Sequence, residues 1–329
     1  MNHSYPKTFF FYKHQKKADV LENALRQFGW RENRSIANTS CAFFDVDILS
    51  RVEIFNSLHR RDVKLFCYPH SGAPAAGTLN WRGHKPHPYT SAQFVFSPGH
   101  EEILHVIGYP HNIHVVGWAY CKQLPFKPAE QIKSVLFGPL HPNSNGWLSD
   151  DDKAVNQRAF ERLKRASREM DFKLTVRYLQ TPERSGFEPV EEPSITYFQG
   201  HPDNSYEQID NHDVVISTQT LAYLAVARGK PTLMMDEWIA PRAGNKPEMF
   251  QHIDRWDEFK HIMMYPHDIN TTSDVPALIQ HVAQDDSDIQ EWKKRMIGPQ
   301  FSPKKFSEIV ESYLPIPSTG PSKFHVRAV

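Results

Sequence analysis

Short apolar runs alternate with stretches of helical periodicity along the first 120 residues of the chain. The apolar runs are short enough for buried strands, and the stretches between them repeat apolar positions every three to four residues. The pattern predicts strands at 7–12, 42–48, 63–68, 93–97 and 113–119, with helices at 18–28, 49–59 and 100–107. This alternation is typical of a parallel sheet with helices on both faces.

Two prolines and a lack of periodicity mark residues 121–131 as a linker, after which the alternation resumes. The second half of the pattern predicts strands at 134–137, 173–179, 194–198, 214–217, 232–235 and 261–265. It predicts helices at 149–170, 205–209, 221–228, 273–283, 288–296 and 303–313.

The two runs of alternation predict an α/β protein with two Rossmann-like, doubly wound domains facing a cleft. A chain of 329 residues is long enough to bury two cores. We expect an N-terminal domain at 1–125, a C-terminal domain at 131–300, and a terminal helix with a flexible tail at 301–329. Ligands of open α/β sheets lie beyond the carboxyl ends of the strands, so the loops that follow strands are where a site is expected.

Composition narrows the classes of function. Lys plus Arg equals Asp plus Glu at 38 each, which gives no support to a nucleic-acid partner but leaves room for a local basic face. No stretch reaches the roughly 20 apolar residues of a membrane span, and we expect a cytoplasmic protein. Cys41 and Cys67 lie in apolar runs and are expected to be buried free thiols. The signature motifs of P-loop kinases, Rossmann dehydrogenases, lipases and zincins are absent.

A polar turn between two apolar elements is the most informative segment. In DVVISTQTLAYLAVARGKPTLMM (213–235) a strand runs into Ser217, Thr218, Gln219 and Thr220, and then into a helix of small apolar residues. A helix N-terminus offers unpaired N–H groups and a partial positive charge, and the hydroxyls add further donors, so the turn predicts a phosphate site. The alternative is an ordinary N-cap, which accounts for one of the four polar residues.

This segment resembles the donor-binding segment of GT-B glycosyltransferases and related sugar-nucleotide enzymes. The likeness is to the CDP-glycerol glycerophosphotransferase-like and UDP-N-acetylglucosamine 2-epimerase-like groups, and FQGHPD (198–203) and LFGPLHPN (136–143) add to it. It covers about residues 131–240, whereas the N-terminal half is similar in architecture only.

The resemblance implies a GT-B fold and a donor whose phosphates or sugar are held by the turn, His141 and His201. It also implies a reaction that needs no bound metal or other cofactor. Asp236 and Glu237 are the candidates for the acidic residue that holds the donor ribose.

An acceptor hydroxyl needs a general base, for which His70 and Asp45 are the candidates. His70 opens the longest Gly- and Pro-rich loop of the N-terminal half, and the pKa of an imidazole lies near neutral pH. Asp45 lies near the end of the strand-like run CAFFDVD and would reach a cleft only if its face of the strand does. A surface histidine and a helix-capping aspartate are the alternatives.

Three other residues are candidates for substrate binding. His141 and Asn143 follow a strand in GPLHPNSNG, where a turn can contact a phosphate or sugar. The alternative is a plain turn, because Pro, Asn, Ser and Gly all favour turns. Arg177 lies within the strand-like LTVRYL, and an arginine in a buried strand predicts a phosphate or carboxylate partner. The histidine pairs of HNIH (111–114) and GHKPHP (83–88) lack a cysteine or carboxylate at metal-site spacing, so no metal is predicted there.

The sequence thus predicts a GT-B-type glycosyltransferase, or a related glycerophosphotransferase, that moves a group from a nucleotide-activated donor to an acceptor hydroxyl. The expected partners are a nucleotide-sugar donor and a carbohydrate or other hydroxyl-bearing acceptor. Two alternatives remain open, a sugar-nucleotide epimerase of the same fold and a non-catalytic protein that binds a sugar or nucleotide.

Overall fold

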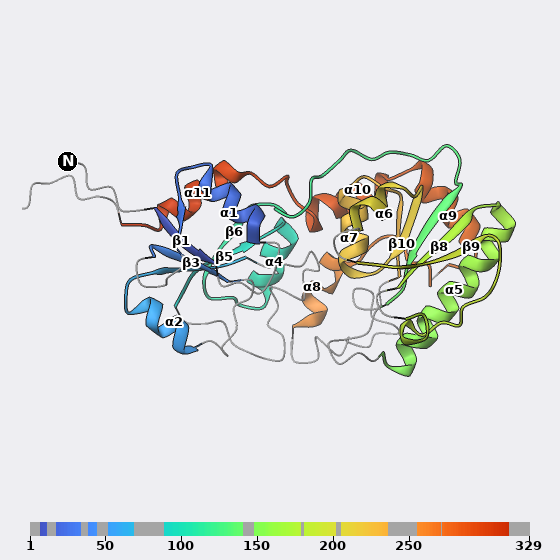
Figure 1. Cartoon of the computed structure of the whole chain (residues 1–329), viewed down its shortest axis with the longest axis horizontal. Coiled ribbons are helices and arrows are strands. Elements are labelled where there is room, and N and C mark those ends of the chain that lie inside the picture. The colour runs from blue at the N-terminus through green and yellow to red at the C-terminus, as the bar shows by residue number, and fades with distance from the viewer. Residues whose placement is uncertain are drawn as a thin grey trace, which may run out of the picture.

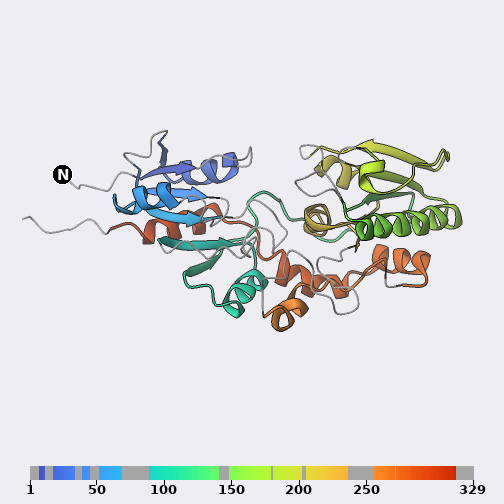
Figure 2. The same cartoon turned by 90° about the horizontal axis from the view of Figure 1, so that it is seen from below.

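Two parallel sheets organise the chain into an N-terminal and a C-terminal lobe (Figure 1). The computed structural model describes residues 7–11, 18–33, 39–44, 52–68, 89–140, 148–178, 181–201, 205–235, 255–270 and 272–315. Residues 121–131, predicted as a linker, carry no helix or strand. The two predicted parallel sheets are confirmed, and each lobe has helices packed beside its strands (Figure 2).

The sheet of the N-terminal lobe has the strand order β2-β1-β3-β4-β5-β6, and all of its pairs are parallel. Its strands are Thr8–Phe11 (β1), Arg31–Glu32 (β2), Cys41–Phe44 (β3), Lys64–Cys67 (β4), Thr90–Val95 (β5) and Asn112–Val115 (β6). Residues of β3 are buried on both faces, as its unbroken apolar run predicts. The edge strand β2 was not predicted, because two residues are too few to show a period.

The helices of this lobe include one from the far end of the chain. They are Ala18–Arg26 (α1), Val52–His59 (α2), Pro98–Val106 (α4) and Pro303–Ser312 (α11). Helix α11 lies beside α1 in the N-terminal lobe (Figure 1), where Trp30 Nε1 donates a hydrogen bond to Ser307 Oγ at 3.0 Å. Phe306 packs against the rings of Phe43 and Phe94 in the core of that lobe. The predicted helix at 303–313 is confirmed, and the domain boundaries stay a prediction.

The sheet of the C-terminal lobe has the order β11-β10-β7-β8-β9, again all parallel. Its strands are Ser134–Gly138 (β7), Lys173–Tyr178 (β8), Ile195–Gln199 (β9), Val214–Ser217 (β10) and Thr232–Met234 (β11). The helices that precede α11 in this half of the chain are Asp150–Met170 (α5), Ser205–Asp210 (α6), Gln219–Ala227 (α7), Trp256–Met263 (α8), Val275–Gln284 (α9) and Ser287–Met296 (α10). The chain winds outward from β7 in one direction through β8 and β9, and in the other through β10 and β11. The topological switch point therefore lies between β7 and β10.

One predicted strand is wrong. Residues 261–265 were expected to be extended, but the chain forms helix α8 up to Met263. Trp256, Phe259, Ile262 and Met263 are buried at helical spacing, and the helix packs on α4 of the N-terminal lobe. The apolar run at 262–265 resembled a short strand, because the part of α8 that precedes it is polar except at Trp256 and Phe259.

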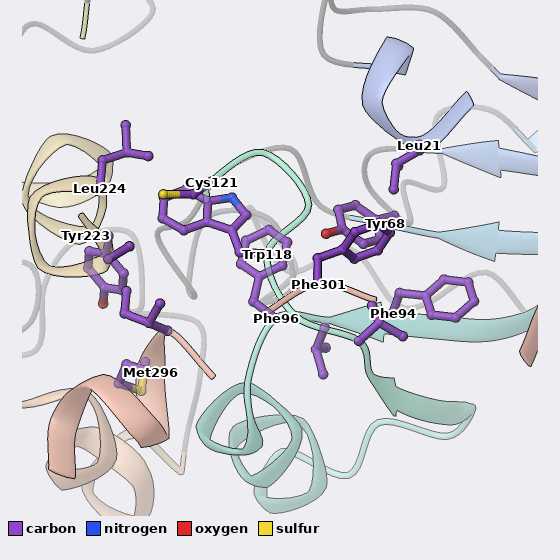
Figure 3. Packing of buried hydrophobic residues seen from close by; sticks show 14 of the residues in the cluster. Leu21, Tyr68, Phe94, Phe96, Trp118, Cys121, Tyr223, Leu224, Met296 and Phe301 are labelled. Atoms are coloured by element: carbon purple, nitrogen blue, oxygen red, sulfur yellow. The ribbon is translucent and has the colours of Figure 1, made fainter. Parts of the chain in front are cut away.

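Apolar packing continues from one lobe to the other. Trp118 and Cys121, which follow β6, lie between the N-terminal core around Tyr68 and the helix that carries Tyr223 (Figure 3). These side chains belong to one continuous cluster of buried residues. Cys41, Cys67 and Cys121 are all buried and free, as predicted for the first two.

Candidate functional site

The polar turn predicted to bind phosphate lies at the carboxyl end of β10, on the switch point of the C-terminal sheet. Ser217 is buried, and its Oγ donates a hydrogen bond of 2.9 Å to the carbonyl oxygen of Gly138, its partner at the end of β7. A Cβ on Gly138 would lie 2.4 Å from that hydroxyl, so glycine is required for this contact. The Ser217 hydroxyl therefore ties β10 to β7, a role that sequence reasoning missed.

Thr218 stands at the N-cap position of α7 without capping it. Its backbone is extended, with φ −119° and ψ 164°, and its side chain makes no cap hydrogen bond. The residue is only 2% exposed. Thr220 is half-buried in the first turn of α7, and the side chain of Gln219 lies outside the described part. Thr218 is therefore not an ordinary N-cap. The positive end of the α7 dipole lies at the switch point, where β10 ends and α7 begins.

Arg177 supplies a buried positive charge on β8, which is separated from β10 by β7. Arg177 is 8% exposed. Nη2 donates to the carbonyl oxygen of His201 at 3.1 Å and to Ser205 Oγ at 3.2 Å, whereas Nε has no hydrogen-bond partner among the described residues. Burial lowers the pKa of this guanidinium, and no carboxylate of a described residue offsets the effect. Such an uncompensated buried cation is costly for folding, which points to an anionic ligand.

Gly200 makes room for this guanidinium. A Cβ at Gly200 would lie 2.5 Å from both Cζ and Nε of Arg177. The amide of Gly200 donates to the carbonyl oxygen of Tyr178 at 2.6 Å, which fixes the backbone where β9 ends beside β8. His201 was predicted to bind the donor through its side chain. It contacts Arg177 through its backbone carbonyl oxygen. A glycine at the end of a strand was the available sequence signal for this close approach.

The strand order brings the turn and the guanidinium to the same side of the sheet, at the carboxyl ends of its strands. Ser217 pairs with Gly138 on β7, and Arg177 lies on β8, the next strand across. Two strand spacings separate Ser217 from Arg177, which is about 10 Å between their backbones. We call this group of Ser217, Thr218, Thr220, Arg177 and Gly200 the polar edge.

Asn156 of α5 holds the start of the loop that leaves β7. Its Nδ2 donates to the carbonyl oxygens of Leu140 at 2.9 Å and of Ser185 at 2.5 Å, and its Oδ1 accepts from the amide of Leu140 at 2.8 Å. The side chain is completely buried. It thus fixes the backbone immediately before residue 141, at the same carboxyl edge.

Five of the predicted site residues lie outside the described part of the chain. The structure consequently leaves the predicted general bases and three predicted substrate contacts untested. These residues are Asp45, His70, His141, Asn143 and Glu237. In the described ranges, no helix is both long and apolar enough to cross a bilayer.

The two Rossmann-like lobes and their all-parallel sheets define a GT-B glycosyltransferase-like fold, as the sequence predicted. The structure of Staphylococcus aureus MnaA with UDP is similar at a TM-score of 0.55 and 10% identity, covering 93% of this chain and 95% of that one. A Listeria monocytogenes protein assigned as a UDP-N-acetylglucosamine 2-epimerase gives a TM-score of 0.55 at 9% identity, covering 94% and 97% of the two chains. At such identities the likeness is one of fold. No family model matches the chain, and no curated protein matches its sequence.

Proposed function

We propose that the protein is a GT-B-type transferase that moves a group from a nucleotide-activated donor to an acceptor hydroxyl. The observation that carries the proposal is the buried Arg177, which has no described counter-charge and lies at the carboxyl edge of the donor-side sheet. A diphosphate is the anion that a GT-B transferase would bind at such an edge, since donors of this class are linked through phosphates. The guanidinium can donate two parallel hydrogen bonds to phosphate oxygens.

Each member of the polar edge has a role in this proposal. The Nε–H of Arg177, which is unused within the described residues, would donate to one phosphate oxygen. The first-turn amides of α7 and the hydroxyls of Thr218 and Thr220 would donate to others. Negative charge develops on the leaving diphosphate as the bond to the transferred group breaks, and fixed donors stabilise that charge without rearranging. The Ser217 hydroxyl would act by positioning the turn, because it is bonded to Gly138.

The acceptor half of the reaction stays a proposal from the sequence. His70 or Asp45 would take the proton of the acceptor hydroxyl as the hydroxyl attacks the donor. Glu237 would contact the donor ribose, and His141 and Asn143 the phosphates or sugar. We propose that turnover needs no bound metal, because Arg177 and the helix dipole supply the charge stabilisation.

Calorimetric titration with nucleotides tests the donor site. UDP, CDP and GDP and their sugar-linked forms make the panel, with UDP first because MnaA was solved with it. Replacing Arg177→Met should weaken binding of the preferred nucleotide by about 1.5–3 kcal/mol, or roughly 10- to 150-fold, since hydrogen bonds to charged groups are lost. Gly200→Ala should weaken it as well, by displacing the guanidinium while leaving its charge in place.

A stability measurement separates a ligand-binding arginine from a structural one. Removal of an uncompensated buried charge should leave the melting temperature of ligand-free Arg177→Met unchanged or raise it. Arg158→Met, on the exposed side of α5, is the matched control and should alter neither quantity. A sharp fall in melting temperature with unchanged nucleotide affinity would refute the role of Arg177. No nucleotide binding below millimolar concentration would refute the donor site itself.

Turnover assays distinguish the alternatives. A transferase forms product only when an acceptor is present, apart from slow donor hydrolysis. A sugar-nucleotide epimerase converts its donor without any acceptor. A non-catalytic protein binds the nucleotide, and the substitutions His70→Ala and Asp45→Asn then leave every measured property unchanged.

A further inference from the structure

Three metal-ligating side chains meet at a place that the proposed function does not use. His267, His281 and Asp288 hold their ligand atoms within 4.8 Å of one another, the single group of this kind in the described ranges. Asp288 Oδ2 lies 3.7 Å from His267 Nε2. The rings of His267 and His281 lie 5.2 Å apart at an angle of 81°. We propose that these three residues bind a divalent first-row transition-metal ion of the Zn²⁺ class.

The three residues come from separate elements that are each held in place. The carbonyl oxygen of His267 accepts from the amide of Met234 at 3.2 Å, which fastens the segment after α8 to the end of β11. His281 lies in the last turn of α9, and Asp288 in the first turn of α10. The connection between the two helices is short, because only Asp285 and Asp286 separate them, and Asp285 N donates to the carbonyl oxygen of His281 at 3.0 Å where α9 ends. Backbone motion is therefore not required to assemble the group.

The spacing of the ligand atoms suits a small ion. Tetrahedral zinc with bonds of about 2.0–2.1 Å places its ligand atoms about 3.3 Å apart. The contact between His267 and Asp288, at 3.7 Å, is already near that value. His281 and Asp288 are exposed, so their side chains can rotate to close the remaining distance.

The donor set selects the class of ion. Two imidazoles and one carboxylate suit zinc, copper, nickel, cobalt or iron, whereas magnesium and calcium favour ligands that are all oxygen. Three protein ligands leave a coordination position for water. His114, from the HNIH segment, has a different partner, because its Nε2 lies 2.7 Å from the hydroxyl oxygen of Tyr313.

Bound metal would link the segment that contains His267, which lies beside the edge strand β11, to both α9 and α10. Because the folded chain assembles the ligands and the unfolded chain does not, the ion stabilises the folded form. The effect expected here is on the stability of the fold, and it does not depend on the proposed transferase activity. Its readouts are metal affinity and melting temperature.

Titration of EDTA-treated, dialysed protein with Zn²⁺ tests the site, with Mg²⁺ and Ca²⁺ as comparison ions. The wild type should bind one Zn²⁺ through this group and melt at a higher temperature with it. His281→Ala and Asp288→Asn lead the variants because both side chains are exposed, so folding should persist. Each should weaken Zn²⁺ binding by at least about tenfold and remove most of the thermal shift. His105→Ala, on the exposed side of α4, should behave as the wild type does.

Cobalt substitution gives a second readout. Co²⁺ in the wild type should show ligand-field absorption of a low-coordinate nitrogen and oxygen site, and His281→Ala should abolish it. Zinc affinity that is the same in His281→Ala, Asp288→Asn and wild type would overturn the proposal, because the ion would then be held elsewhere. Absence of stoichiometric binding to the wild type would overturn it equally.

Discussion

His100 makes the stability of the protein depend on pH in a way that can be calculated. The side chain is 2% exposed within α4, its ring packs edge-on against Phe96 at 5.6 Å, and neither ring nitrogen hydrogen-bonds to a described residue. Burial lowers the pKa of His100 from 6.5 to about 3. The imidazole is therefore neutral in the folded protein at every pH of practical interest, and charged in the unfolded protein below about 6.5.

The direction and size of the effect follow from proton binding. Between pH 6.5 and about 3 the unfolded chain binds a proton at His100 that the folded chain does not, so the free energy of unfolding falls as the pH falls. The loss amounts to about 1.4 kcal/mol per pH unit in that interval, and therefore to about 2 kcal/mol between pH 8 and pH 5. The value at pH 5 depends only on a native pKa well below 5.

The assay compares wild type with His100→Leu by urea unfolding, followed by tryptophan fluorescence at pH 8 and pH 5. Burial also lowers the pKa of His114, His212 and His267, so the wild type loses further stability in acid. The substitution cancels only the share of His100, and the free-energy difference between the two proteins should shift by about 2 kcal/mol in favour of the variant. His105→Ala is the control and should follow the wild type. Equal pH dependence in wild type and His100→Leu would refute the reasoning.

Four other substitutions test the site and the core. Thr218→Ala and Thr220→Ala should each lower donor affinity by about 1.5–3 kcal/mol but cost about 1 kcal/mol or less in stability, as paired calorimetry and melting curves can measure. If melting falls sharply while affinity holds, the turn is structural only. Asn156→Ala leaves the buried amide and carbonyl of Leu140 without their partner and should cost at least about 2 kcal/mol in urea unfolding; a neutral result would show that water replaces it. Phe306→Ala should cost about 3–5 kcal/mol, and a loss below 1 kcal/mol would mean that α11 contributes little to the N-terminal core.

Local patterns predicted most of the fold because each strand and helix carries its own period. β10 is apolar at every position before Ser217, as a strand buried on both faces must be. α8 was missed because the packing that decides it is with α4, about 150 residues earlier in the chain. The apolar positions 256, 259, 262 and 263 do have helical spacing, but the run HIMMY (261–265) taken alone is also typical of a short strand, and a local pattern does not show the contact with α4.

The candidate site was predictable in location more than in detail. An arginine within a strand and a polar turn after a strand made Arg177 and Thr218 candidates, and both side chains are buried in the structure. The hydroxyl of Ser217 could not be assigned, because its acceptor lies on β7, whose adjacency to β10 follows only from the sheet order. Gly200 became significant only once the guanidinium was seen beside it.

Helix α11 is synthesised last but packs in the N-terminal lobe, so its position determines which lobe can finish folding first during translation. Trp30 and its partner Ser307 are 277 residues apart in the chain. At about 5–20 residues per second, synthesis of that interval takes about 14–55 s. Strands β3 to β6 are made early in this interval, and until α11 emerges the sheet that they form lacks the helix that covers Phe43 and Phe94. Strands β7 to β11 and helices α5 to α10 emerge within the same interval, so the second lobe to be translated is the first that can be completed.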